Sequence, residues 1–321
     1  MGLHLPGAGR TRPAGTRARR GALLATLVAG AVLLGGCSGG ERLGFPDPRS
    51  EQGQHNLHLW QGAWIAALIT GGIVWGLIFY VVWHYRRRSE KDIPVQTRYN
   101  LPLEIFYTIA PVLMVIVFFS HTVKTQNAIL DEPAKVDNVI EVVGQQWAWT
   151  FNYGIGQVDN SADKDVTDDT YPYSDYAYDA GTGSHIPTLV LPEHATTRFN
   201  LHSADVIHDF GVPDFGMRMD VVPGRVNHYT ITTEGATAHY DESAPDLISG
   251  ETFRGACYEL CGLYHSRMIF KVAVVSQDDY QSYVNALEQK GFETKGAPML
   301  GGGKSTLPAD LNANETEGGS E

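Results

Sequence analysis

Two long apolar runs, separated by a basic segment, constrain the fold of this chain more than any other feature. The first run covers residues 57–83 and the second covers residues 103–123. At ~1.5 Å rise per residue, a helix over the first run would be about 40 Å long, enough to cross about 30 Å of hydrocarbon with some tilt. Tryptophans lie near both ends of this run, as they do at membrane interfaces. The two runs therefore predict a transmembrane helical hairpin over residues 57–123.

The charges around the hairpin predict its orientation. Arg86, Arg87, Arg88 and Lys91 follow the first run at once, and short basic loops stay in the cytoplasm. Everything after residue 123 is therefore expected on the extracytoplasmic side of the membrane. The second run carries Glu104 near its start. An acid at the mouth of a membrane helix is costly unless it is solvated or functional, so its position leaves open an interface-level carboxylate or a functional group.

The N-terminal 36 residues have the pattern of an export signal. An arginine-rich start precedes an apolar run over residues 22–34, which is too short to span a bilayer comfortably. The sequence Leu34-Gly35-Gly36-Cys37 resembles a bacterial lipobox, which predicts cleavage after residue 36 and a lipid on Cys37. Residues 37–56 would then be a lipidated linker on a bacterial cell-membrane protein. The alternative is an uncleaved anchor with a free thiol.

From residue 132 onward the pattern is that of a globular domain. Short runs between Gly, Pro and Asp turns predict strands at residues 139–143, 188–191, 194–201, 226–232 and 268–275. This spacing favours an antiparallel β-sandwich or barrel. Ser276 is a candidate N-cap for a terminal helix over residues 278–289. The domain is expected to cover residues 132–290, with a Gly-, Ser- and Glu-rich disordered tail at residues 291–321.

A polar segment rich in aspartate and tyrosine covers residues 154–185 and is interpreted as an acidic insertion in this domain. A loop of this length is usually functional or mobile, and the alternative is a solvated insertion without a partner. The whole chain has a formal net charge of -12. Such a surface would repel nucleic acid and suits a basic partner protein.

The strongest chemical signal is a short segment that combines two thiols, an imidazole and a thioether: Cys257, Cys261, His265 and Met268. Soft sulfur with imidazole selects copper or zinc among the common metals. His208, which precedes a Pro/Gly turn, is the best candidate for one more ligand from elsewhere in the chain. Single-copper sites use one Cys, so a second thiolate can bridge a second copper ion. A disulfide between the cysteines and a zinc site are the alternatives.

The segment 257–268 resembles the copper signature of cytochrome c oxidase subunit II. The resemblance implies a transmembrane hairpin followed by an all-β, cupredoxin-like Greek-key sandwich with a dinuclear copper A (CuA) centre. The copper ligands would fall on His208, Cys257, Glu259 (through its backbone carbonyl), Cys261, His265 and Met268. The Glu259 carboxylate would also bind a magnesium ion shared with subunit I.

Two further segments carry the resemblance. Residues 144–149, Gly-Gln-Gln-Trp-Ala-Trp, are similar to the aromatic stretch before the family's first β-hairpin. Trp147 would there receive electrons from cytochrome c; the alternative is core packing, which suits Trp149. Residues 103–111 resemble the start of the family's second membrane helix, where Glu104 falls on an acid linked to proton uptake. The chain departs from the family at Ala256, where Gln is usual, and at Asn152, where relatives often carry an acid.

The resemblance implies a non-autonomous subunit of a respiratory oxidase. It would take electrons from cytochrome c at the copper pair and pass them to the haem and copper of subunit I, coupled to proton translocation. The implied partners are subunits I and III, membrane lipid, and a cytochrome c that is soluble or tethered to a cytochrome bc-type complex. The lipobox and the acidic insertion look like the actinobacterial branch of the family.

Three rival functions remain on the sequence. A nitrous-oxide or nitric-oxide reductase component can use similar copper centres, but the hairpin and the segment around Glu104 favour the oxidase. A quinol oxidase subunit II shares the hairpin but lacks the copper ligands. A copper-storage or copper-delivery lipoprotein would need neither the Trp147 segment nor a second membrane span.

Overall fold

The computed structural model describes residues 40–89, 96–158, 171–241, 243 and 248–300. Residues 45–321 belong to one compact unit. From the unit before it the structure describes the short 3-10 helix η1 (Gly40–Arg42) and the two residues after it. The predicted signal at 1–36 and the lipidation site Cys37 lie outside the described residues. So do residues 159–170 of the predicted insertion and residues 301–321 of the predicted tail.

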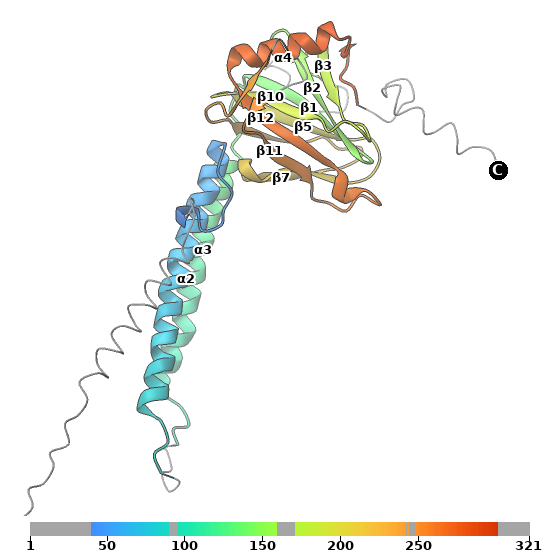
Figure 1. Cartoon of the computed structure of the whole chain (residues 1–321). Coiled ribbons are helices and arrows are strands. Elements are labelled where there is room, and N and C mark those ends of the chain that lie inside the picture. Colours follow the sequence, from blue (N-terminus) through green and yellow to red (C-terminus); the bar gives the residue numbers. More distant parts are fainter. Residues whose placement is uncertain (1–39, 90–95, 159–170, 242, 244–247, 301–321) are drawn as a thin grey trace, which may run out of the picture. The chain divides into compact units, whose positions relative to one another are not determined.

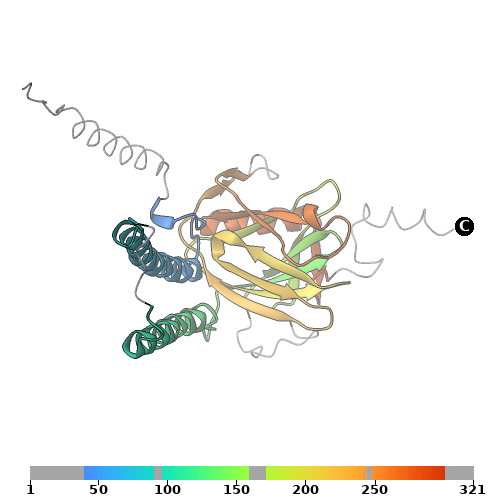
Figure 2. The same ribbon diagram turned by 90° about the horizontal axis from the view of Figure 1, so that it is seen from below.

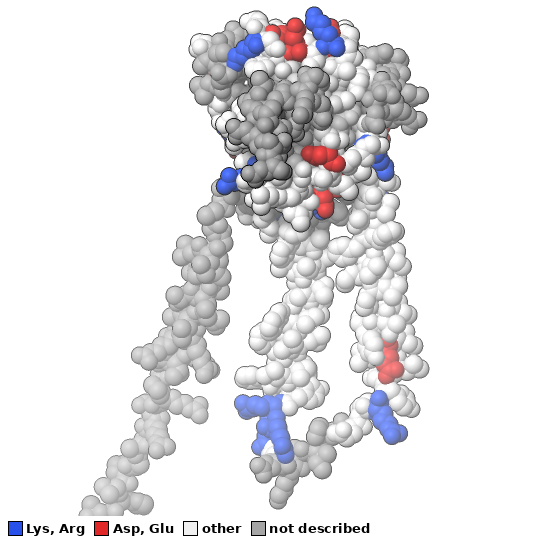
Figure 3. Space-filling view, turned by 90° about the vertical axis from the view of Figure 1, so that its right-hand side faces the viewer, with Lys and Arg blue, Asp and Glu red and all other residues white. Residues whose placement is uncertain are grey.

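Two long helices precede the β-domain, α2 (Glu51–His84) and α3 (Leu101–Ile129), and they lie side by side (Figures 1 and 2). Both are long and apolar enough to cross a membrane. Each extends beyond its predicted apolar run because a polar residue caps its start: Ser50 Oγ accepts the N–H of Gly53 at 3.0 Å, and the Asn100 side chain accepts that of Leu103 at 3.3 Å. Figure 3 shows helices that are uncharged over most of their length, with basic groups and an acidic group near the end away from the β-domain.

The β-domain is a two-layer sandwich, as predicted. One sheet has the order β13-β3-β2-β1-β5-β8 and the other has the order β4-β12-β11-β6-β7. The first consists of β1 (Asn138–Gln145), β2 (Ala148–Ile155), β3 (Asp175–Ala180), β5 (Thr196–Ser203), β8 (Asn227–Thr232) and β13 (Glu293–Lys295). The second consists of β4 (Thr188–Pro192), β6 (His208–Val212), β7 (Met217–Val221), β11 (Phe253–Cys257) and β12 (Ile269–Val275). A small pair, β9 (Ala238–Tyr240) and β10 (Ile248–Gly250), lies beside them.

The core lies between the two sheets because alternate residues of each strand point inward. On the first sheet these residues include Trp149 and Phe151, and on the second they include Phe210 and Phe270. The rings of Phe210 and Phe270 stack with centroids 5.0 Å apart, and Trp149 packs edge-on against both. All four side chains are fully or almost fully buried. This aromatic core ends directly below the residues of the predicted metal site.

The expectation of a purely antiparallel sandwich is wrong for two strand pairs. β1 pairs with β5 in parallel, and β12 pairs with β4 in parallel. Parallel neighbours need a long connection between them, and in each case many residues separate the two strands in the sequence. The remaining pairs in both sheets are antiparallel.

The interpretation of residues 154–185 as an inserted loop is also wrong for part of its length. Residues 175–180 form β3, which pairs antiparallel with β2. Tyr173 and Tyr176 are buried and pack with Val139 on the face of the first sheet opposite the main core. Gly154 lies directly under Tyr173: a Cβ atom built on it would be 1.9 Å from the tyrosine ring. These tyrosines therefore act as a second, smaller core.

We expect Gly154→Ala to destabilise the β-domain by about 1–3 kcal/mol, the usual result of forcing an extra methyl group into a filled space. The alanine would have to displace the Tyr173 ring from the sheet. Thermal or denaturant unfolding measures the change. Gly183→Ala is the matched control because a Cβ atom there meets nothing within 4 Å. Equal stability of the two variants would contradict the close packing of Tyr173.

The C-terminal part of the described chain differs from the prediction as well. The helix α4 (Gln277–Gln289) is confirmed, with Ser276 accepting the N–H of Asp279 at 3.2 Å as its N-cap. The predicted tail, however, begins with ordered structure. β13 (Glu293–Lys295) pairs with β3, and Met299 is buried with its N–H donated to Asn152. The pairing partner of β13 could not be read from the short, polar sequence of this segment.

The start of α2 is joined to the β-domain by buried polar contacts. Ser50 Oγ donates to the carbonyl of Phe215 at 2.9 Å, and Gln52 accepts the N–H of Thr232 at 3.1 Å. The amide of Asn56 donates to the carbonyl of Gly216 at 2.7 Å. Phe215 and Gly216 close the 3-10 turn η2 (Pro213–Phe215), which connects β6 and β7. The first turns of α2 therefore belong to the β-domain as much as to the hairpin.

Candidate metal centre

One loop, between β11 and β12, carries most of the predicted metal ligands. β11 ends at Cys257, whose N–H donates to the carbonyl of Met268 at 2.9 Å, so the two ends of the loop are fastened together. Inside the loop, Gly262 has a φ of 121°, in a region that favours glycine. The short 3-10 helix η3 (His265–Arg267) then turns His265 back toward the cysteines. The paired strands thus hold a loop that would otherwise be free to move.

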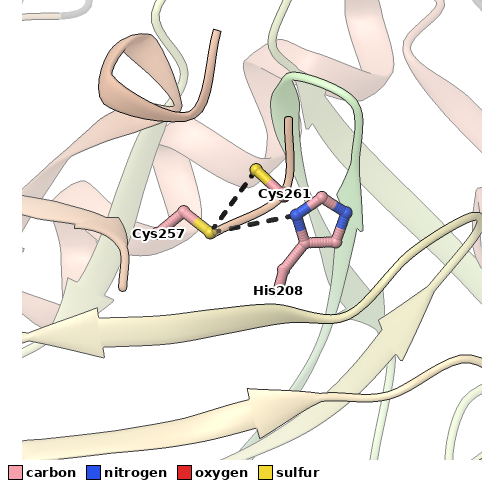
Figure 4. Close-up of side chains that lie close together, drawn as sticks. All are labelled: His208, Cys257 and Cys261. Carbon is pink, nitrogen blue, oxygen red and sulfur yellow. Dashed lines mark hydrogen bonds between the residues drawn. The ribbon is translucent and has the colours of Figure 1, made fainter. Parts of the chain in front are cut away.

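The two cysteines are free, buried thiols whose sulfur atoms lie 3.9 Å apart. A disulfide would place them about 2.05 Å apart, so this structure does not contain the disulfide alternative. His208, Cys257 and Cys261 come together from β6 and the loop (Figure 4). Among the described residues, this is the group of His, Cys and acidic side chains close enough to hold a metal ion.

Each thiol has its own imidazole. Cys257 Sγ lies 3.8 Å from Nδ1 of His208, and Cys261 Sγ lies 3.6 Å from Nδ1 of His265. Two weaker donors lie beside them: the Glu259 carbonyl oxygen is 3.2 Å from Cys257 Sγ, and the Met268 sulfur is 3.7 Å from Cys261 Sγ. Donors that bind one ion at about 2.0–2.3 Å lie roughly 3–4 Å apart. The separations therefore suit ligands of shared metal ions.

The donor set fits copper. Thiolate, thioether and imidazole together are the ligands that copper prefers, and structural zinc sites rarely include methionine. Two thiols with one imidazole on each side offer equivalent surroundings to two ions. The structure brings all six predicted copper ligands into one cluster. The carbonyl of Glu259 lies beside the cluster, while its side chain is exposed.

The electrostatics of the two thiols also favour a cation. Burial alone would raise the pKa of Cys257. The hydrogen bonds with His208, with the backbone at Asp209 and Glu259, and with His265 together outweigh burial and lower that pKa to about 7. Burial raises the pKa of Cys261, and the charge of the neighbouring Cys257 raises it further. Two thiolates this close repel each other unless positive charge lies between them. Metal ions held by Cys257 and Cys261 would remove that repulsion and favour the deprotonated form of both sulfurs.

Asp205 orients His208 and was missed at the sequence level. Nε2 of the buried His208 lies 2.8 Å from Asp205 Oδ1 and donates to it, which leaves Nδ1 facing the sulfurs. Burial would lower the pKa of His208, but Asp205 and then Cys257 raise it to about 9. The other Asp205 oxygen accepts the N–H of Gln146 at 2.7 Å. An acid three residues before a candidate ligand was the signal that could have identified it.

Trp147 lies at the edge of the cluster and is half-buried. Its indole N–H donates to the carbonyl of Cys261 at 3.2 Å, and its ring meets Tyr264 edge-on at 5.0 Å. Trp149, two residues later, is fully buried in the aromatic core, which agrees with the packing role expected for it. The two tryptophans therefore have different surroundings, and only Trp147 contacts a ligand residue from the surface side.

Glu104 lies far from this cluster in the chain, in the first turn of α3. Its carboxylate accepts the backbone N–H of Asn100 at 3.0 Å and so helps to cap the helix. This contact gives the side chain a local structural role in addition to any part in proton uptake. The structure does not bring Glu104 and the metal ligands together.

Comparison with known proteins identifies the family of this chain. A solved periplasmic domain of subunit II of cytochrome oxidase from Bradyrhizobium japonicum is 24% identical, covering 49% of this chain and 96% of its own, with a TM-score of 0.34. The family model described as "Cytochrome C oxidase subunit II, periplasmic domain" matches residues 138–275. A probable cytochrome c oxidase subunit 2 of Streptomyces avermitilis is 41% identical over 302 residues, which cover 86% of this chain and 89% of that protein. The cytochrome c oxidase subunit 2 of Mycobacterium tuberculosis H37Rv is 34% identical, covering 83% and 81%. The chain therefore belongs to the cytochrome c oxidase subunit II family.

Proposed function

We propose that this chain receives electrons from cytochrome c on behalf of a respiratory terminal oxidase. The observation that carries the proposal is the pair of free thiols 3.9 Å apart, each next to its own imidazole. Two copper ions held by these donors would supply one-electron transfer between the cytochrome and the haem and copper of subunit I, where oxygen is reduced and protons are translocated. The family membership supports the same assignment.

The role of this chain is to fix the positions of the donor atoms and to exclude water from them. His208 is fully buried, and both sulfurs of the thiol pair are nearly so. Paired strands fix both ends of the ligand loop, and Asp205 fixes the ring of His208. A site whose ligands are held in place by the fold changes little on gaining or losing an electron. That rigidity is what an electron carrier needs.

Trp147 is proposed as the residue that accepts electrons from the docked cytochrome. It is half-buried, and its indole N–H donates to the backbone of the ligand Cys261. A partner that touches the exposed part of the ring would be one hydrogen bond away from a ligand residue. The donor would be a soluble cytochrome c or one tethered to a cytochrome bc-type complex.

The chain is a membrane protein whose C-terminal β-domain lies on the extracytoplasmic side. Further parts of the proposal concern its neighbours. The exposed Glu259 carboxylate would share a magnesium ion with subunit I, Glu104 would belong to a proton-uptake path, and subunit III would complete the complex.

A signal at 1–36 and a lipid on Cys37 would add an anchor. The proposed domain from residue 132 would extend past residue 290 to include β13.

Metal analysis with electron paramagnetic resonance tests the proposal on the purified complex or the copper-loaded chain. We expect about two copper ions per chain and hyperfine structure from one electron shared equally over both, as the two equivalent halves of the donor set require. A single-copper spectrum would instead indicate a blue-copper site. Zinc without a paramagnetic signal would indicate metal delivery or storage.

A further inference from the structure

A cavity of about 450 Å³ lies between the start of α2 and the underside of the β-domain. Three segments line the cavity: residues 45–46 before α2, α2 itself, and the turn η2 with the glycine after it. The lining includes Phe45, Asn56, Leu59, Trp60, Ala63 and Pro213. The amide of Asn56 is already used, since it donates to the carbonyl of Gly216. The rest of the lining is almost entirely apolar, so the cavity suits an apolar guest.

The charged and aromatic residues of α2 place this cavity at the membrane surface. The cytoplasmic end of the span is marked by Trp83, Tyr85 and the three arginines after them. About 30 Å of hydrocarbon corresponds to about 20 helical residues, and counting back from Trp83 reaches Ala63 and Trp64. The cavity extends from Asn56 to Ala63 along the helix. Its Ala63 end therefore opens at the outer hydrocarbon boundary, beside the upper ends of the outer-leaflet acyl chains.

The cavity is continuous with the membrane-facing surface of α2. Trp60 forms one of its walls, contacts Phe45 at 6.4 Å and Trp64 at 5.9 Å, and is 39% exposed. Directly toward the membrane, the apolar side chains of Leu68 and Ile69 are about 60% exposed, at 62% and 61%. Exposed apolar side chains thus occur along α2 from the membrane-spanning part up to the mouth of the cavity.

We propose that this cavity binds the upper part of one acyl chain of a phospholipid in the outer leaflet. A flexible acyl chain can bend into a cavity of this size. A partner helix is about 10–12 Å wide with its side chains, so only a single side chain of such a helix could enter the cavity. The belt formed by Trp60 and Trp64 would then lie at the glycerol level of the same lipid. The bound acyl chain would fill the space between α2 and the β-domain.

The test uses the intact oxidase complex in bilayers that contain phosphatidylcholine with a photoactivatable diazirine near the top of one acyl chain. After illumination, mass spectrometry maps the lipid adducts to peptides. We expect adducts at residues 45–46 and 56–63 besides those on the membrane-facing surface. In Ala63→Phe, the added ring fills the cavity, and adducts at these residues should fall about tenfold, because about two methylene groups lose their burial.

Gly62→Phe is the matched control: it adds the same ring one residue away, outside the cavity lining, where a Cβ atom meets nothing within 4 Å. A second variant, Phe45→Ala, opens the wall of the cavity and should also reduce the adducts. Copper content confirms that each variant is folded. Equal adducts in Ala63→Phe and Gly62→Phe would overturn the proposal. Cross-linking of residues 56–63 to another polypeptide, in place of lipid, would overturn it in favour of a protein partner.

Discussion

Replacing Cys257 by serine is expected to abolish the copper pair. The Cys257 sulfur lies between the Cys261 sulfur at 3.9 Å and His208 Nδ1 at 3.8 Å, so its loss removes a donor from both proposed metal positions. A hydroxyl oxygen is a harder donor than a thiolate and binds copper poorly. Oxidase activity with cytochrome c should fall by more than the roughly 10–100-fold typical of losing a residue that only supports a ligand.

Copper content and the hyperfine pattern measure this loss directly, before any assay of activity. Ala256→Ser is the matched control, because it introduces the same side chain one residue earlier in β11, on the opposite face of the strand. That variant should keep both copper ions. If Cys257→Ser retained two copper ions with a shared electron, the thiol would not be a bridging ligand and the proposed site would be wrong.

Trp147→Phe should slow electron uptake from reduced cytochrome c by on the order of 100-fold, comparable to misplacing a reacting group by about 1 Å. Phenylalanine keeps a ring beside Tyr264 but has no N–H to donate to the carbonyl of Cys261. The variant therefore loses the hydrogen bond from the indole to Cys261, while the amide of Gln146 still donates to the same carbonyl at 2.7 Å. Stopped-flow absorbance of the cytochrome, at low and moderate salt, measures the rate.

The copper spectrum of Trp147→Phe should match that of the unaltered protein, since Trp147 supplies no donor atom to the cluster. Tyr264→Phe provides the control: it keeps the ring that packs against Trp147 and removes only a hydroxyl group. Its rate should stay close to that of the unaltered protein. Unchanged electron uptake in Trp147→Phe would exclude the indole N–H as part of the route and would move the docking point elsewhere.

Much of the fold could be predicted from local patterns. The apolar runs predicted α2 and α3, and short runs between Gly, Pro and Asp turns predicted β1, β4, β5, β8 and β12. Ser276 predicted the start of α4. Chain spacing also sufficed to group four of the candidate ligands, because Cys257, Cys261, His265 and Met268 lie on one short loop.

The rest depends on contacts between distant parts of the chain. Nothing local indicates that β1 lies parallel to β5 or that the tyrosines after residue 170 pack against Val139. The role of Asp205 is similar: its two oxygens hold His208 and the backbone of Gln146, which comes from another strand connection. Sequence patterns report which side chains are present, whereas such pairings depend on which strands become neighbours.

The position of β13 bears on how this domain stays soluble. Without β13, β3 would be the last strand of its sheet, and its unpaired N–H and C=O groups could pair with another molecule. β13 covers part of that edge, and the N–H of Tyr178 donates to the carbonyl of Phe292 just before it. A fragment that stops at residue 290, at the end of the terminal helix, would expose this edge. The few residues after the helix thus protect the domain against aggregation through strand pairing, although they contribute nothing to the metal site.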